Sequence, residues 1–185
     1  VDCELENFLI DLDKLEYYLD RQTFILNSKC YNKNTKKQIK AIIPVHLFGH
    51  PLNMKRLIKI AKKFHLIVIE DSAEAIGTFY DKKHVGTFGK IGILSFNGNK
   101  TITTGGGGII LTNNYKLAIK IKHLSTTAKI KHAWKSEHDF IGYNYRMPNI
   151  NAALLVAQLE KLNNFITNKR KLANKYEAFF KNMDY

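Results

Sequence analysis

The 185-residue sequence lacks most of the features that mark membrane, secreted and zinc-binding proteins. It contains no apolar run of the roughly 18 residues that a transmembrane helix needs. Its first residues, VDCELENFLI, lack the basic and apolar regions of a signal peptide. Its two cysteines, Cys3 and Cys30, form no CxxC motif and lie far from any histidine cluster. We therefore expect a cytoplasmic protein without membrane association, disulfide framework or zinc site.

Arginine is scarce although the chain is strongly basic. The net charge is +13, yet only four of the 29 basic residues are arginine. Bidentate recognition of bases and phosphates favours arginine, and the lysines are scattered singly or in pairs. This pattern is typical of a solvated surface, so we expect no nucleic-acid partner.

The hydrophobic pattern predicts an α/β fold. Helical spacing predicts helices over residues 10–19, 53–65, 117–124 and 150–180, and short apolar runs predict strands over 41–47, 66–70, 91–96 and 108–112. The polar segment 27–40 is predicted to be a loop. Asp13 and Glu16 have the spacing of a capping box, and Pro44 places its strand at a sheet edge or a bulge. Strand, helix and strand over 41–70 form a βαβ unit, which implies a parallel sheet covered by helices.

Charged residues are almost absent between Ile91 and Tyr115, where Lys100 is the one charged residue. Lys100 follows a predicted strand, and the carboxyl ends of strands in open α/β sheets are where ligands bind. A partly desolvated lysine without carboxylates nearby can act as an amine nucleophile and form a Schiff base. Charge spacing by itself favours the alternative, an exposed loop lysine.

Two further features lie near this edge of the predicted sheet. The glycines of Gly105–Gly108 suit either the close approach of a phosphate or cofactor, or a tight turn; the segment does not match a P-loop. Asp71 ends the buried run LIVIE, where its carboxylate can hold a cationic ring nitrogen. Alternatively Asp71 caps a helix, because Asp71 and Glu74 also have capping-box spacing.

The remaining candidates are histidines and an amide. His46 and His50 have the spacing of a helical metal pair, but the glycine and proline beside His50 argue against a helix, and we expect no metal site. Asn144 and Arg146 lie among aromatic residues before the last predicted helix. They either grip a ligand or a partner subunit, or satisfy loop backbone.

Five blocks of sequence, taken in order, resemble the DegT/DnrJ/StrS family of sugar aminotransferases. The blocks are PVHLFGHPLNM, VIEDSAEAIGT, VGTFGKIGILSFNGNK, TTGGGGIILTNN and IGYNYRMPNINAALLVAQLEKL, and the resemblance runs from about Ala41 to Lys175. It implies a pyridoxal 5'-phosphate (PLP) enzyme of the aspartate-aminotransferase fold. The stretch SFNGNKTITTGGGG is similar to the LegC-like branch, which aminates UDP-linked 4-keto-6-deoxy sugars in legionaminic acid synthesis for bacterial surface glycans.

The resemblance also implies roles for five residues. Lys100 is the lysine that forms the Schiff base with PLP and shuttles the proton during transfer. Asp71 is the partner of the pyridinium nitrogen, and Ser95 binds the cofactor phosphate. Asn144 reaches the cofactor phosphate of a neighbouring subunit, which implies a homodimer with shared active sites. Glu74 lies where many members have a glutamine near the ring hydroxyl.

The reaction implied is a ping-pong transamination from an amino donor, expected to be glutamate, to the 4-keto sugar. Family members are longer than this chain. We therefore expect residues 1–165 to be part of a PLP-binding large domain and 166–185 to end a long helix that leads toward a small domain. Such a piece is expected to expose apolar surface and to hold the cofactor weakly. The alternative is an inactive truncated relative that serves as a scaffold or partner-binding module.

Overall fold

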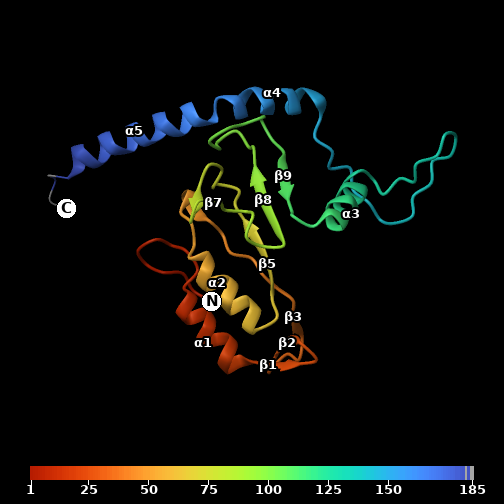
Figure 1. The fold of residues 1–185 in the computed structure, drawn as a ribbon, viewed down its shortest axis with the longest axis horizontal. Helices are drawn as coiled ribbons and strands as arrows, with labels where there is room; N and C mark the ends of the chain where they lie inside the picture. Colours follow the sequence, from red (N-terminus) through yellow and green to blue (C-terminus); the bar gives the residue numbers. More distant parts are fainter. Residues whose placement is uncertain (182, 184–185) are drawn as a thin grey trace.

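The computed structural model of the protein describes residues 1–181 and Met183, and Figure 1 shows their arrangement. A central sheet carries the N-terminal helices and short strands at one end and a long helical rod at the other (Figure 1). None of the helices in this described part is long and apolar enough to cross a membrane.

The central sheet has four strands in the order β4-β5-β8-β9. β4 (Ala41–Ile42) and β5 (Ile67–Asp71) are parallel and are connected through α2 (Met54–Lys63). β8 (Ile91–Ser95) is parallel to β5, whereas β9 (Gly108–Leu111) is antiparallel to β8. The predicted βαβ unit and the predicted mainly parallel α/β sheet are confirmed.

The segment predicted as a loop over 27–40 contains two strands, so that prediction was wrong. β1 (Thr23–Leu26), β2 (Lys29–Asn32) and β3 (Gln38–Ile39) form an antiparallel three-stranded sheet. Cys30 lies opposite both Ile25 and Ile39 in the register and is fully buried. Two to four residues per strand are too few for a visible alternation, and the polar neighbours conceal the single buried side chain.

The N-cap of the first helix lies two residues before the predicted cap, Asp13. α1 spans Leu12–Gln22, and Oδ1 of Asp11 accepts hydrogen bonds from the backbone N–H groups of Asp13 and Lys14, both at 2.9 Å. Asp13 therefore lies inside the first turn and pairs with Arg56 of α2. Asp11 satisfies the free amides of the helix start, which is the role of an N-cap.

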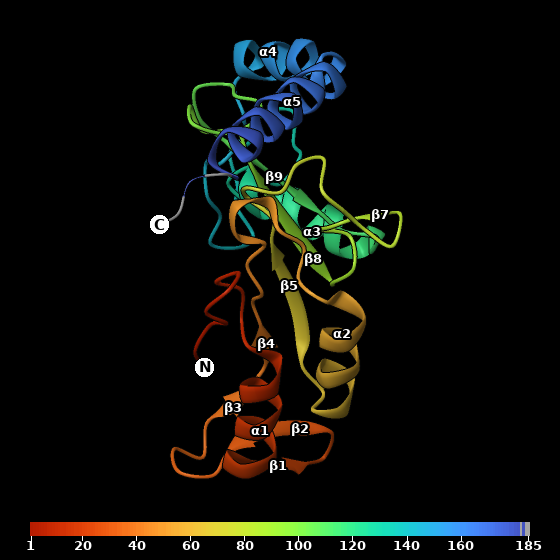
Figure 2. The same cartoon turned by 90° about the vertical axis from the view of Figure 1, so that its left-hand side faces the viewer.

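One face of the sheet is covered and the other is bare. The covered face packs against α1 and α2 (Figure 2), and its core comprises Leu12, Leu15, Leu19, Ile42, Met54, Leu57, Ile60, Ala61 and Val68. On the other face the register aligns Asp71, Ile93 and Ile110 of β5, β8 and β9 in one row, which Val45 extends through an isolated bridge to Asp71. Five aliphatic side chains on that face are between 38% and 59% exposed: Ile43, Val45, Ile67, Ile93 and Ile110. The expectation that the chain exposes apolar surface is confirmed.

Short elements connect the sheet to the C-terminal helices. A 3-10 turn, η1 (Leu47–Gly49), follows β4, and a hairpin of β6 (Phe79–Tyr80) and β7 (Lys83–His84) precedes β8. After β9 comes α3 (Tyr115–Ser125), close to the predicted 117–124.

The long helix predicted over 150–180 is divided in two. α4 spans Asn149–Glu160 and α5 spans Leu162–Phe180, with the break at Lys161 (Figure 1). No glycine or proline lies at the break to indicate it in the sequence. A second core joins this rod to the sheet through Leu94, Phe96, Ile102 and Leu155.

Candidate active site

Asp71 and Ser95 end two neighbouring parallel strands. Asp71 is the last residue of β5 and pairs in register with Ile93 of β8, and Ser95 lies two residues further along β8. Because side chains alternate along a strand, Asp71, Ile93 and Ser95 share the bare face of the sheet. Both predicted residues thus lie at the carboxyl edge of the sheet, where open α/β folds bind ligands.

Asp71 is fixed by its backbone and does not cap a helix. Its N–H donates to the carbonyl of Pro44 and its carbonyl accepts from the N–H of His46, both at 2.9 Å. Its Oδ1 accepts from the N–H of Ala73 at 3.1 Å. Residues 72–78 form turns instead of a helix, so the helix-cap alternative was wrong. Within the described part of the chain, Oδ2 of Asp71 has no hydrogen-bond donor.

Lys100 is shielded and paired with Glu74. Its Nζ donates to Oε1 of Glu74 at 3.1 Å, and the two side chains are 16% and 33% exposed. The exposed-loop alternative for Lys100 was therefore wrong, because five-sixths of the side chain is out of contact with water. The expectation of a lysine without a nearby carboxylate was also wrong, since Glu74 lies 26 residues away in sequence and adjacent in space.

Glu74 connects two loops as well as binding Lys100. Its Oε2 accepts from the backbone N–H of Phe48 in η1 at 2.9 Å. The Phe48 amide and the Lys100 ammonium together hold the pKa of the Glu74 carboxyl below its ordinary value. Glu74 is thus a carboxylate at neutral pH, and it is the hydrogen-bond acceptor for Nζ of Lys100 in this structure.

A buried carboxylate behind the strand edge was not identified from the sequence. Glu70 and His46 are both fully buried, and Nε2 of His46 donates to Oε2 of Glu70 at 3.2 Å. The same carboxylate accepts from the N–H groups of Gly86 and Phe88 at 2.7 Å and Gly89 at 2.6 Å. Burial would raise the pKa of Glu70, but these donors outweigh burial and the pKa lies below its ordinary value.

The Glu70 carboxylate therefore anchors two loops to β5. Nδ1 of His46 accepts from the N–H of Leu52 at 3.2 Å, so His46 has a partner on each ring nitrogen. A histidine used in this way is not available to a metal ion. The sequence signal for this anchor was the GTFG stretch around Gly86 and Gly89, whose small residues let backbone amides approach an acid.

The glycine run is a turn that leads into β9. Gly105 and Gly107 have positive φ values of 80° and 93°, a conformation that favours glycine. The run is tied to α4, because Nδ2 of Asn151 donates to the carbonyl of Thr104 at 2.6 Å. At Gly108 a side chain would lie 2.6 Å from the carbonyl oxygen of Leu94. The turn alternative accounts for these three glycines.

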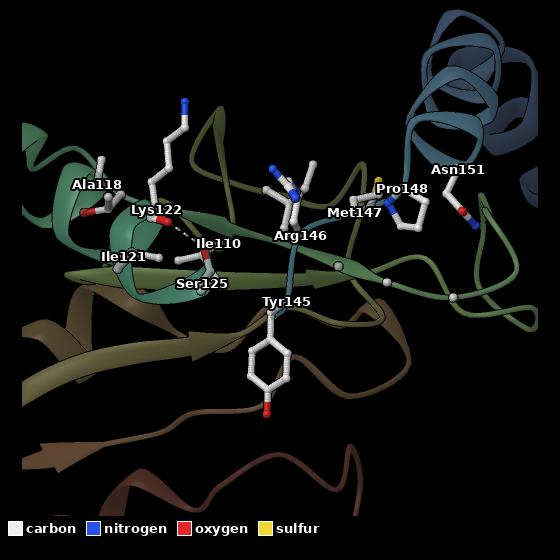
Figure 3. A pocket seen from close by; sticks show the side chains of 15 residues that line it. Ile110, Ala118, Ile121, Lys122, Ser125, Tyr145, Arg146, Met147, Pro148 and Asn151 are labelled. Carbon is white, nitrogen blue, oxygen red and sulfur yellow. Dashed lines mark hydrogen bonds between the residues drawn. The ribbon is translucent and has the colours of Figure 1, made fainter. Parts of the chain in front are cut away.

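Asn144 does not line the cavity of about 200 Å³ to which Lys100 contributes. It is exposed and forms an isolated antiparallel bridge with Thr126, just after α3. Arg146, by contrast, lines a cavity of about 810 Å³ beside β9, α3 and the glycine run. Figure 3 shows the side chains of Tyr145 and Arg146 pointing to opposite sides of their segment. Lys100 does not line this cavity, so size alone does not identify the candidate site.

The residues at the strand edge have the chemistry that PLP needs. A shielded amine at Lys100 suits its aldehyde, a carboxylate at Asp71 suits its ring nitrogen, and a hydroxyl at Ser95 suits its phosphate. Ser95 Oγ accepts only a long hydrogen bond, 3.4 Å, from the N–H of Asn97 within the described part. The donor set fits the group on three positions of one sheet edge.

Comparison with known proteins shows which curated proteins and solved structures this chain resembles. It is 45% identical over 160 residues to GDP-perosamine synthase of Escherichia coli O157:H7. The aligned region covers 85% of this chain and 43% of that protein. The solved structure of Helicobacter pylori PseC, an aminotransferase in pseudoaminic acid biosynthesis, matches with a TM-score of 0.84 and 29% identity. E. coli GDP-4-keto-6-deoxy-D-mannose-3-dehydratase with bound hydrated PLP matches with a TM-score of 0.81 and 26% identity.

The structural matches cover all of this chain but only part of the longer proteins. All of this chain aligns with PseC and with the dehydratase, but it covers only 46% and 48% of those chains. The chain thus spans about half the length of the proteins that it matches. All 185 residues match one family description, and the chain belongs to the DegT/DnrJ/EryC1/StrS aminotransferase family.

Proposed function

We propose that the protein is a PLP-dependent aminotransferase that transfers an amino group, from glutamate, to a nucleotide-linked 4-keto-6-deoxy sugar in surface-glycan biosynthesis. The observation that carries the proposal is the shielded amine of Lys100, held by Glu74 at the strand edge that also presents Asp71 and Ser95. Family membership and the named relatives support the same reaction class.

Each of these residues has a distinct task in the proposed reaction. Bound PLP supplies the electron sink that makes a carbon next to the amino group acidic. Asp71 would hold the ring nitrogen in its protonated form, and Ser95 would bind the phosphate. Lys100 would hold the cofactor and then carry a proton to and from the reacting carbon. Glu74 would fix the position of the Lys100 amine through the hydrogen bond between them.

The proposal also covers the nucleotide carried by the sugar substrate and the oligomeric state. The SFNGNKTITTGGGG stretch supports a UDP-linked 4-keto-6-deoxy sugar of the legionaminic acid type. The E. coli relative, a GDP-perosamine synthase, supports a GDP-linked sugar as the alternative acceptor. The exposed Asn144 supports a homodimer in which this residue serves the neighbouring active site.

The test is chemical capture of the cofactor. The chain is incubated with PLP, reduced with borohydride and mapped by peptide mass spectrometry. We expect the label at Lys100, its loss in Lys100→Ala, and its retention in the control Lys90→Ala, because Lys90 is exposed before the other end of β8. Labelling of surface lysines without Lys100 would contradict the proposal.

Turnover is then measured with glutamate and either UDP- or GDP-linked 4-keto-6-deoxy sugar. Transfer to the UDP-linked sugar alone supports the legionaminic acid type, and transfer to the GDP-linked sugar alone supports the alternative. The bare sheet face favours a second candidate, an inactive relative that serves as a scaffold or partner-binding module. That candidate predicts neither label nor transfer.

A further inference from the structure

A continuous groove leads from Lys100 to α5. The cavity that Lys100 lines has a volume of about 200 Å³, and a second cavity of about 560 Å³ adjoins it. The two share Phe48, Glu74, Ile76 and Thr101 as lining residues. We call the two cavities together the Lys100 groove.

One stripe of α5 forms the far wall of this groove. Ile166, Lys169, Arg170 and Ala173 line it at positions i, i+3, i+4 and i+7, which is one face of a helix. The helix is seated closely, because a side chain at Gly77 would overlap with Ile166. Lys169 and Arg170 are therefore held at the groove by the position of α5.

The charges in the groove are unbalanced. Its one carboxylate, Glu74, is already bound by the Lys100 ammonium and the Phe48 amide. Within the described part of the chain, Lys169 and Arg170 have neither an ion pair nor a side-chain hydrogen bond. Two free cations, one of them an arginine, are the groups that bind phosphate oxygens.

Two exposed aromatic rings also line the larger cavity. Phe48 is 71% exposed and Phe79 is 59% exposed. Phe48 has the backbone angles φ 53° and ψ 20°, a left-handed conformation that is uncommon for a bulky residue. The bond from its N–H to Glu74 holds it there. Backbone outliers held by their surroundings cluster at functional sites, and an exposed ring offers a stacking surface to a nucleobase.

We propose that the Lys100 groove binds the nucleoside diphosphate end of the sugar substrate, with Lys169 and Arg170 on the diphosphate and Phe48 against the base. This inference rests on the proposed function. The compartment at Lys100 suits the reacting sugar, while the larger one falls in the range of roughly 300–1,000 Å³ typical of small-molecule sites. The carboxylates of the amino donor are the other anions that such cations could bind, but they would leave the aromatic rings unused.

Binding is measured with the full 185-residue chain by isothermal titration calorimetry at low ionic strength. The probes are UDP, GDP, inorganic pyrophosphate and glutarate. We expect K169A/R170A to weaken UDP or GDP binding by about ten- to a hundred-fold, since charge-assisted hydrogen bonds to phosphate are lost. The matched control is K171A, which removes the neighbouring positive charge of α5 from outside the groove and should change affinity by less than about two-fold.

Phe48→Ala separates the base from the diphosphate. It should weaken nucleotide binding several-fold and leave pyrophosphate binding unchanged. Equal nucleotide affinity in Phe48→Ala and the unchanged chain would contradict the placement of the base. Circular dichroism spectra and melting curves check that each variant is folded, which we expect because Lys169 and Arg170 are exposed.

Four outcomes overturn the inference. They are no binding of UDP or GDP by the unchanged chain, unchanged affinity in K169A/R170A, an equal loss in K171A, or a loss for glutarate alone, which would assign the cations to the amino donor. Borohydride labelling of Lys100 in the same preparations separates the two proposals. Label without a nucleotide effect defeats the groove alone, whereas a nucleotide effect without label defeats the proposed function alone.

Discussion

Replacing Glu70 by alanine or glutamine should destabilise the chain strongly. Glu70→Ala removes the acceptor of four hydrogen bonds, and the Gly86 N–H and the His46 Nε2–H then remain buried without a partner. Each unsatisfied buried donor costs about 1–3 kcal/mol. The Phe88 and Gly89 amides are only partly buried and regain water. We therefore expect a loss of about 3–5 kcal/mol in the free energy of unfolding, as for other broken buried pairs.

Glu70→Gln is the sharper variant because it keeps the shape of the side chain. One amide oxygen can still accept from Phe88 and Gly89, but the new NH₂ group faces the donors of Gly86 and His46. We expect a loss of about 2–4 kcal/mol, measured by urea unfolding followed by circular dichroism. The exposed acid Glu137, changed to Gln, is the control and should stay within about 0.5 kcal/mol of the original chain.

The pH dependence gives a second readout of the same site. The pKa of Glu70 is lower in the folded chain than its ordinary value of 4.5. Its contribution is therefore complete above about pH 4.5 and is lost as the pH falls through the folded pKa. The stability difference between the original chain and Glu70→Gln should shrink below pH 4.5. A Glu70→Gln variant that unfolds at the same urea concentration as the original chain would refute the anchor role.

The other predictions concern Glu74, Phe48 and two glycines. Glu74 should titrate below its ordinary pKa in carbon-detected NMR, and Phe48→Gly, which removes the exposed ring but keeps the amide donor, should leave that shift in place. Phe48→Gly should have a free energy of unfolding about 1 kcal/mol higher than Phe48→Ala, because glycine accepts positive φ without strain; equal urea midpoints would contradict this. Gly92→Ala should lose at least about 2 kcal/mol in urea unfolding, since its side chain would overlap with the Gly86 carbonyl. Gly106→Ala, which faces open space, is its control and should change little.

The sequence predicted the sheet edge but not the contacts made there. The run LIVIED and the isolated Lys100 placed an acid and an amine after two strands, and both lie at the carboxyl edge. The pairing of Lys100 with Glu74 was missed because it joins two loops 26 residues apart. Sequence spacing shows which residues share one helix or strand, whereas this contact depends on the order of β5 and β8 in the sheet.

Other differences have equally local causes. The strands around Cys30 were missed because they are only two and four residues long and Cys30 is their one buried side chain, too few for periodicity to reveal. The break at Lys161 was missed because nothing in its sequence disfavours a helix. The buried role of Glu70 was hidden because its partners are backbone amides, which every residue type supplies.

The exposed face of the sheet links the stability of the fold to the binding of a charged ligand. Asp71 and Ser95 lie there among exposed isoleucines, on strands whose composition is typical of burial from both sides. Any layer that covers those isoleucines contributes about 25 cal/mol per Å² of apolar area removed from water. The same layer lowers the local dielectric constant around the Asp71 carboxylate and strengthens its attraction for a cation. Once covered, the same isoleucines therefore contribute both to the stability of the fold and to the affinity of the site for a charged ligand.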